Sequence, residues 1–305
     1  MTEPEGTLHL PIDFSLGRIT VYVNGHPLEP AEIFEARGTI RVSKKAKLFL
    51  DLSQEVCDEL RRIHLVPPSL LSNGISILQK RLEKADFREF RTITDLKSLS
   101  VSLCPVIRVE QLRQLGMLTS LEHLSLSSTE LDSPDFSWVP QFPNLRTLNL
   151  FGVGADDRCL AFLSGLAALQ QLDLSRARLS DEGVQSLWQF RHLKALSLGE
   201  CQVGDEALRG ISHSFSLHTL KLPGTRISDN GVELIAREFG SRKSDQLKFL
   251  ELQSCQITDR SVVYLASLRS LSVIGLRETN VTPEAVAFLR RSLPKCRIMV
   301  EQVKL

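Results

Sequence analysis

The feature that most constrains the fold is a leucine pattern that recurs about every 24 residues. It is clearest in Leu169–Val203, where the L-x-x-L-x-L spacing of Leu169, Leu172 and Leu174 starts again at Leu193. A fixed period of this length is typical of a solenoid, in which each repeat forms one coil and buries its apolar side chains against neighbouring coils. The pattern therefore predicts one elongated repeat array.

The repeat can be followed through most of the chain by the apolar residue at its fourth position, which we call the marker residue. The markers are Leu50, Ile75, Leu99, Leu124, Leu148, Leu172, Leu196, Leu220, Leu250, Ile274 and Ile298. They are 24 or 25 residues apart, except for a step of 30 between Leu220 and Leu250. The spacing divides the chain into an arm and β-rich cap (1–46), degenerate repeats (47–95) and regular repeats with a closing strand (96–305).

Each coil contains the same predicted elements. The L-x-L core is expected to form a short strand with its two leucines inward, and an aliphatic residue seven positions on turns the chain back into the core. An aspartate then precedes apolar residues at helical spacing, as in Asp157, Asp181, Asp205, Asp229 and Asp259. Aspartate before such a spacing is typical of the N-cap of a helix, so each coil should carry a short outer helix.

The first residues of the chain lack the leucine pattern. Residues 1 to about 16 are predicted to be a loose arm. Alternating residues in Arg18–Val23, Thr39–Val42 and Leu48–Leu52 predict strands, whereas Pro27 and Pro30 argue against a return strand directly after the first of them. We expect these strands to form a cap over the open end of the array, because a solenoid otherwise exposes its first apolar layer.

Two coils depart from the common pattern. In the coil that begins at Leu121, the three prolines Pro134, Pro140 and Pro143 predict that no regular outer helix forms. Six extra residues within Ala236–Asp245 indicate either a longer outer helix that stops at Gly240 or a recognition loop.

Composition excludes several classes of protein. Charged residues make up 24% and the formal net charge is +1, which gives no sign of a nucleic-acid-binding surface. The sequence contains no apolar run long enough for a membrane span and no secretion signal at its start. The six cysteines lack C-x-x-C spacing, so we expect a reducing compartment, the cytoplasm, and no metal site.

Three cysteines share one position of the repeat, at the turn after the strand. Cys104, Cys201 and Cys255 alternate there with residues such as Thr129 and Thr225. A buried thiol or hydroxyl at this position can bond the backbone of a neighbouring coil, which predicts a structural ladder. A redox or metal role is the alternative, but these cysteines lie on coils that are not nearest neighbours, beyond disulfide reach.

The register L-x-x-L-x-L-x-x-(Cys/Thr), followed by motifs such as Thr225–Asp229 and Thr279–Pro283, resembles the cysteine-containing and ribonuclease-inhibitor-like branches of the leucine-rich-repeat superfamily. These motifs and the ending Leu293–Ile298 are similar to bacterial leucine-rich repeat proteins. The resemblance implies an α/β fold: a right-handed β/α horseshoe with a parallel concave sheet and, here, a small β-rich N-terminal cap. It also implies protein binding on the concave face.

The predicted binding residues are side chains that point outward from the strands or lie just beyond them. They are His123, Thr147, Asn149, Phe151, Gln171, Asp173, Arg176, Glu200, Lys221, Phe249, Glu251 and Arg277. Phe151 and Phe249 favour a partner surface, because exposed aromatics are common anchors in interfaces. The alternative is that these positions are merely solvated, and for His123 a plain surface role is the default.

Motifs of catalysis and nucleotide binding are absent from the sequence. We therefore expect a non-enzymatic, monomeric module that binds a protein partner, as an inhibitor or scaffold, and neither nucleic acid nor a membrane; we expect no catalytic residue, cofactor or metal. One alternative is an effector or ubiquitin-ligase-type adaptor whose residues 1–90 recruit machinery, although no F-box-like opening is present. Another is an enzyme with an unrecognised site in residues 1–90.

Overall fold

A computed structural model describes most of the chain. The described residues are 5–9, 16–22, 32–37, 39–43, 47–58, 60, 74–83, 85–93, 95–133, 135–211, 217–240 and 247–300. They fall into two compact units, Met1–Leu148 and Asn149–Leu305.

The first unit begins with the predicted β-rich segment. Its strands are β1 (Glu5–His9), β2 (Gly17–Tyr22), β3 (Glu32–Glu35), β4 (Thr39–Ser43), β5 (Lys47–Leu52), β6 (Ile75–Leu78), β7 (Ser98–Ser102) and β8 (His123–Ser125). β2 pairs antiparallel with both β3 and β5, and β5 to β8 then pair in parallel. The three strands predicted from alternation are confirmed.

One expectation about this segment was wrong. Residues 5–9 are not a loose arm, because β1 pairs antiparallel with β4 in a separate two-stranded sheet. The return strand that pairs with β2 is β3. It begins at Glu32, after the second proline, so the prolines displace the strand along the chain without preventing it. The Asn-Gly pair at 24–25, which is typical of a hairpin turn, lies outside the described residues.

The first unit also contains short helices between its strands. They are α1 (Gln54–Asp58), η2 (Phe87–Ile93), α3 (Val109–Gln114), η3 (Leu115–Met117) and η4 (Val139–Gln141). Among its described residues, the proline-rich coil contains η4, a three-residue 3₁₀ turn, and no regular helix, as predicted. In place of a helix, Phe136, Trp138 and Phe142 fill the layer with fully buried rings, and the Trp138–Phe142 pair packs edge to face at 6.1 Å.

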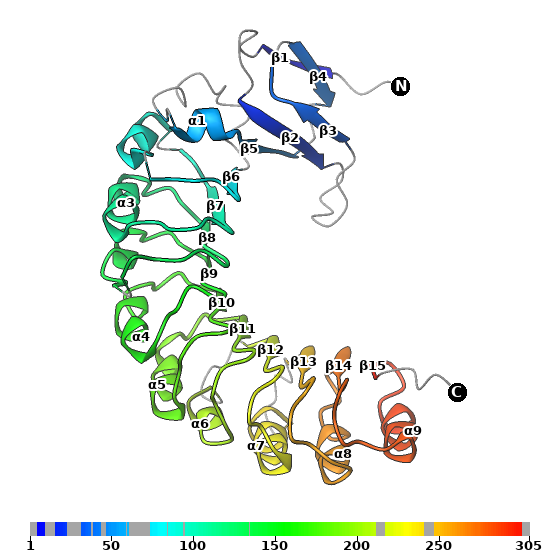
Figure 1. Cartoon of the computed structure of the whole chain (residues 1–305). Helices are drawn as coiled ribbons and strands as arrows, with labels where there is room; N and C mark the ends of the chain where they lie inside the picture. Colours follow the sequence, from blue (N-terminus) through cyan, green and yellow to red (C-terminus); the bar gives the residue numbers. More distant parts are fainter. Residues whose placement is uncertain are drawn as a thin grey trace. The chain divides into compact units, whose positions relative to one another are not determined.

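The second unit repeats one strand and one outer helix. Its strands are β10 (Gln171–Asp173), β11 (Ala195–Ser197), β12 (Thr219–Lys221), β13 (Phe249–Glu251), β14 (Val273–Gly275) and β15 (Arg297–Met299), with β9 (Thr147–Asn149) at the boundary of the units. The helices are α4 (Asp157–Leu163), α5 (Asp181–Gln185), η5 (Ser186–Gln189), α6 (Ala207–Ile211), α7 (Asp229–Gly240), α8 (Arg260–Leu265) and α9 (Pro283–Ser292). Figure 1 shows the helices α4 to α9 on one side of these strands.

The marker residues set the register of the parallel strands. Leu50, Ile75, Leu99 and Leu124 are partners in successive pairs of the first unit, and Leu172 to Ile298 are partners from β10 to β15. Each marker except Ile298, in the last strand, is almost fully buried. Each buried aliphatic contributes roughly 1.5–3 kcal/mol before entropy, so the stacking of coils stabilises the array.

The repeated aspartates do not have the role that we predicted. Asp157 and Asp181 begin their helices one residue inside the cap, and Asp259 is at the N-cap position of α8 but makes no capping bond. Their carboxylates instead accept hydrogen bonds from the next coil. Asp157, for example, accepts from the Ser180 amide at 2.9 Å and the Ser180 hydroxyl at 2.5 Å.

A second backbone feature recurs four residues after each marker from Ile75 to Ile274, where the chain leaves the strand with φ between +54 and +67°. The residues there are Gln79, Leu103, Ser128, Gly152, Arg176, Glu200, Gly224, Ser254 and Glu278. This conformation directs the amide to the next coil, as when Arg176 N–H donates to Gly199 O at 2.8 Å and Glu200 N–H to Pro223 O at 2.7 Å. The turn therefore ties each coil to its neighbour.

The cysteine ladder is confirmed. The Cys201 thiol donates to Leu174 O at 3.2 Å and the Cys255 thiol to Leu222 O at 3.1 Å, each on the preceding coil. The Thr129 hydroxyl donates to Val101 O at 3.0 Å in the same manner. All six cysteines are free thiols.

The insertion between Leu220 and Leu250 lengthens the outer helix. α7 extends from Asp229 to Gly240, as the first of our two interpretations predicted. The recognition-loop alternative concerns the rest of Ala236–Asp245, and residues 241–245 lie outside the described residues. In the described part of the chain, no helix has the length and apolar character to cross a membrane.

Candidate functional site

The candidate site of the second unit is the face of the sheet opposite its helices, which we call the strand face. On β10 to β13 the central leucine is buried while its two neighbours are half-buried or exposed. This alternation leaves one row of side chains before the markers and one after them on the strand face. Most of the predicted binding residues occupy these rows or the turns that follow.

Phe151, Arg176 and Glu200 form one connected cluster on three successive coils. The Arg176 guanidinium carbon lies 4.9 Å from the centroid of the Phe151 ring, within cation–π range. The same guanidinium pairs with Glu200 through two hydrogen bonds, Nε to Oε2 at 3.0 Å and Nη2 to Oε1 at 3.1 Å. The Arg176 and Glu200 side chains are 53% and 54% exposed, so this ion pair faces the solvent.

Lys221, Phe249 and Glu251 form a second cluster, on β12 and β13. The Lys221 ammonium lies 5.5 Å from the centroid of the Phe249 ring, and Lys221 is the register partner of Glu251. Phe151 and Phe249 are both half-buried beneath a cation. Our expectation of openly exposed aromatic anchors was therefore wrong in detail, because each ring is paired with a basic side chain.

Of four other predicted residues, two form hydrogen bonds within their own turns and two are exposed to solvent. The side chains of Asn149 and Asp173 accept hydrogen bonds at 2.9 Å from the amides of Phe151 and Ser175, two residues on, so they shape the turns after β9 and β10. Gln171 and Arg277 are exposed.

His123 and Thr147 lie in the first unit. His123 Nδ1 is 3.0 Å from the Thr147 hydroxyl, on the next coil. The predicted site residues therefore divide between the two units, and only the ten from Asn149 onward share the strand face of the second unit.

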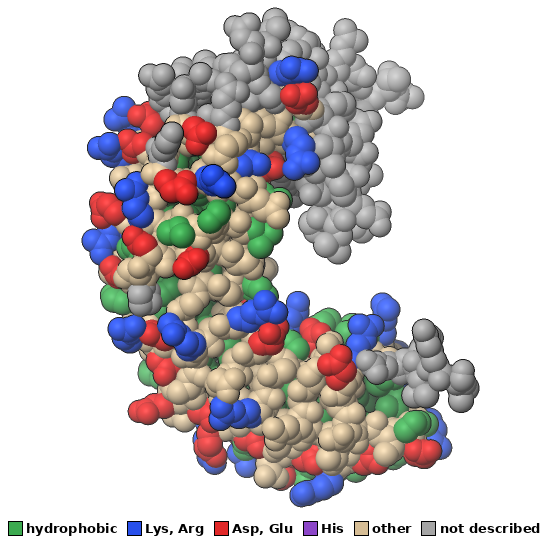
Figure 2. Space-filling model, viewed as in Figure 1, with side chains coloured by type: hydrophobic (Ala, Val, Ile, Leu, Met, Phe, Trp, Pro, Cys, Tyr) green, Lys and Arg blue, Asp and Glu red, His purple; other side chains and the backbone are tan. Residues whose placement is uncertain are grey.

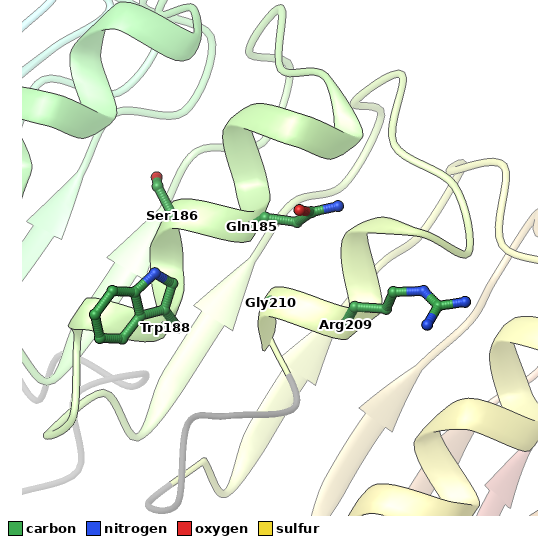
Figure 3. A pocket seen from close by; sticks show the side chains of 5 residues that line it. All are labelled: Gln185, Ser186, Trp188, Arg209 and Gly210. Atoms are coloured by element: carbon green, nitrogen blue, oxygen red, sulfur yellow. The ribbon is translucent and has the colours of Figure 1, made fainter.

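A pocket on the helix side was missed by the sequence analysis. It has a volume of about 460 Å³ and is lined by Gln185, Ser186, Trp188, Arg209 and Gly210. Trp188 is 52% exposed, and its position in a helical turn gave no sequence signal beyond its size. In Figure 3 the Arg209 side chain points away from the Trp188 ring, so the lining groups do not converge on one ligand position.

Charge is mixed over the visible surface of the molecule. Figure 2 shows basic and acidic side chains interspersed, with apolar side chains in small patches. On the helix side of the second unit, the large apolar side chains with substantial exposure are Phe162, Trp188, Val263 and Phe288. Isolated residues of this kind are normal on protein surfaces.

Groups suited to metal binding or nucleophilic chemistry do not come together in the described ranges, where no three His, Cys, Asp or Glu side chains form a possible metal site. Burial raises the pKa of the Cys57 and Cys159 thiols to about 12 and that of Cys201 to about 11. Thiols in such surroundings are structural in character, because nucleophilic cysteines need a lowered pKa.

Comparison with known proteins agrees with this geometry. The leucine-rich repeat family model matches residues 168–187, 191–212, 213–236 and 246–266. The structure of internalin C2 from Listeria monocytogenes superposes with a TM-score of 0.54 at 22% identity, covering 72% of this chain and 92% of that chain. Internalin InlF from the same organism gives a TM-score of 0.48 at 15% identity, covering 82% and 90%. None of the curated protein sequences matches the chain.

A plant structure was also found, the ectodomain of the receptor kinase GASSHO1/SCHENGEN3 from Arabidopsis thaliana in complex with CASPARIAN STRIP INTEGRITY FACTOR 2. Its TM-score is 0.47 at 18% identity, covering 77% of this chain and 28% of that chain. The matched residues between 168 and 266 are leucine-rich repeats, and the internalin C2 superposition shows that the chain has the leucine-rich repeat fold. Its assignment to the cysteine-containing or ribonuclease-inhibitor-like branch stays a prediction.

Proposed function

We propose that the chain is a non-enzymatic module that binds a protein partner through the strand face of its second unit. Leucine-rich repeats generally serve as protein-interaction modules, because their stacked strands present a long continuous surface. Asn149, Phe151, Gln171, Asp173, Arg176, Glu200, Lys221, Phe249, Glu251 and Arg277 are the contact candidates.

The observation that carries the proposal is the connected cluster of Phe151, Arg176 and Glu200. Arg176 and Glu200 have φ values of +64° and +57°, a conformation in which an L side chain is disfavoured relative to glycine. Gly152 and Gly224 occupy the equivalent position on other coils, so the turn does not require a side chain there.

The exposed pair also gains little for the fold, since surface ion pairs contribute about 0–1 kcal/mol. A connected group of exposed side chains that adds little to stability supports a role in recognition. Arginine and aromatic residues are enriched among the residues that dominate binding energy.

The test is capture of partners from the native cell with the full chain as bait. Combined substitution of Phe151→Ala and Arg176→Ala is expected to reduce recovery of the partner at least tenfold. Trp188→Ala removes an exposed aromatic from the helix side and is the matched control, with recovery unchanged. A folded double variant that recovers the partner as well as the wild type does would refute the proposal.

We also propose that the protein acts as a monomer, without cofactor or metal, in a reducing compartment such as the cytoplasm. Six unpaired thiols support the choice of compartment. The adaptor alternative concerns residues 1–90, many of which lie outside the described ranges, and it stays a prediction.

A further inference from the structure

Positive charge gathers where the strands of the second unit begin. The residues that carry it, which we call the basic rim, are Arg191, Lys194, Lys248, Arg269, Lys295 and Arg297, all exposed. No Asp or Glu occurs in the described segments that contain these residues or lie between them. These segments are 191–195, 217–219, 247–249, 269–273 and 294–297. The whole chain has a formal net charge of only +1, so the rim is a local segregation of charge.

Backbone hydrogen bonds align part of the rim in a row. Lys194 O accepts from His218 N, His218 O from Lys248 N, Lys248 O from Ser272 N and Ser272 O from Arg297 N, each at 2.8 Å. Successive coils of a parallel sheet lie about 4.8 Å apart, so Lys194 and Lys248, two coils apart, have backbones roughly 10 Å from each other.

Five of the six rim cations have no carboxylate partner among the described residues. Elsewhere in the second unit Arg158, Arg176 and Arg209 pair with nearby carboxylates. In contrast, Lys194, Lys248, Arg269, Lys295 and Arg297 form no ion pair with any described residue. Like charges kept together without counterions repel one another, and such a surface attracts and orients an anionic partner.

The rim adjoins an apolar part of the strand face. Phe249 follows Lys248 directly, and Val273 is its register partner on the neighbouring strand; both are half-buried. A ligand that reaches both surfaces needs carboxylates beside apolar side chains. An acidic protein segment has both, whereas a nucleic acid offers regularly spaced phosphates.

We propose that the basic rim binds an extended, acidic segment of the protein partner. The proposal rests on the proposed function and names the chemistry of the contact. An extended segment in the polyproline II conformation has three residues per turn and advances about 3.1 Å per residue. Carboxylates three residues apart therefore lie on one side of the segment, about 9 Å from each other, and match the roughly 10 Å between Lys194 and Lys248. An apolar side chain of the same segment then packs against Phe249 and Val273.

The direct test measures fluorescence anisotropy of a fluorescein-labelled peptide made of Glu-Glu-Leu repeats with the full chain. We expect binding that weakens as salt rises and that falls at least tenfold in a variant with Lys194→Glu and Lys248→Glu. The control variant, Arg260→Glu with Arg290→Glu, changes the net charge equally at exposed positions on α8 and α9. Its affinity should stay within twofold, and circular dichroism confirms that both variants are folded.

Several results would overturn the inference. The first is that the acidic peptide does not bind, and the second is that both variants lose the same amount of affinity for it. The third is that an oligothymidylate or phosphatidylserine vesicles bind more tightly than the peptide. Capture of the cellular partner separates this inference from the proposed function. If the rim variant captures it normally while Phe151→Ala with Arg176→Ala does not, the strand face is the binding site and the rim is not.

Discussion

Asp205 of one coil holds Ser228 of the next through two hydrogen bonds. Oδ1 accepts from the Ser228 amide at 2.9 Å and Oδ2 from the Ser228 hydroxyl at 2.5 Å. The hydroxyl in turn accepts from the Asn230 amide at 3.2 Å at the start of α7. The carboxylate thus organises the start of a helix that is not its own, and similar contacts link Asp157 to Ser180 and Asp259 to Thr282.

The first prediction concerns Asp205. Asp205→Ala should lower the free energy of unfolding by about 2 kcal/mol, because hydrogen bonds to charged groups contribute roughly 1.5–3 kcal/mol and the Ser228 amide loses its acceptor. Asp205→Asn keeps one acceptor and should cost about half as much. Urea denaturation followed by circular dichroism measures the effect. Glu206→Ala removes a neighbouring exposed carboxylate as the control, and an alanine variant at 205 as stable as that control would contradict the prediction.

The second prediction concerns Gly183, which lies against the same kind of carboxylate. A Cβ atom at Gly183 would lie 2.0 Å from Asp157 Oδ1 and 2.3 Å from its Cγ. Gly183→Ala must displace Asp157 and break its bonds to Ser180, at a cost of about 2 kcal/mol in unfolding free energy. At Gly204 the nearest atom to an added Cβ is 3.4 Å away, so Gly204→Ala is the control and should be nearly neutral.

A double-mutant cycle locates the cause of this effect. In a chain that already carries Asp157→Ala, the further change Gly183→Ala should cost much less than it does alone, since the clashing carboxylate is gone. Fully additive losses would show that Gly183 acts through some other contact.

The stacking of the chain was predictable because each marker leucine occurs at a fixed interval and only one register buries all of them. The role of the aspartates was not. An aspartate one residue inside a helix and an aspartate at its N-cap look alike in sequence. The sequence also does not show that the carboxylate accepts its hydrogen bonds from a residue 23 or more positions away, on the next coil. The left-handed turns were also hidden, because residues such as Arg176 and Glu200 stand where glycine would have signalled them.

The candidate site was predictable to a similar degree. Alternation identified which side chains leave the strand face, since that follows from strand geometry. The contact of Arg176 with Phe151 depends on side-chain directions across coils, which the spacing does not encode. The basic rim depends on Lys194 and Lys248 lying at the same repeat position, and the outward positions that we predicted on each strand begin one residue later, as at Phe249.

The third prediction concerns thiol reactivity. Burial raises the pKa of Cys57, Cys159 and Cys201 to about 11 or 12, so little thiolate forms at pH 8, and iodoacetamide also cannot reach these sulfurs in the folded chain. Cys296 is the one cysteine that is only half-buried. Mass spectrometry should therefore find alkylation of Cys296 first in the native protein and of all six cysteines in urea. Cys296→Ser should abolish the early modification; rapid native labelling of Cys201 would contradict the burial argument.

The last prediction concerns acid stability and Asp229, which is buried between two coils. Burial raises the pKa of this carboxyl, but hydrogen bonds from the Ser261 hydroxyl and from the Thr258 amide and hydroxyl outweigh it, so its pKa lies below the ordinary value of 3.8. A carboxyl whose folded-state pKa is lowered stabilises the fold above its unfolded-state pKa. That contribution should be complete above about pH 5 and should disappear as the pH falls through the folded-state pKa, below 3.8.

Denaturant midpoints measured from pH 7 to pH 2 test this directly. Asp229→Asn removes the titrating group and should flatten the loss of stability below pH 4, although it lowers the midpoint at pH 7. Ser261→Ala keeps the carboxylate but removes one donor, so it should bring the pKa back toward the ordinary value and give an intermediate slope. An Asp229→Asn chain that loses stability with acid as steeply as the wild type would show that other carboxylates, such as Asp135 and Asp156 with their lowered pKa values, account for the whole effect.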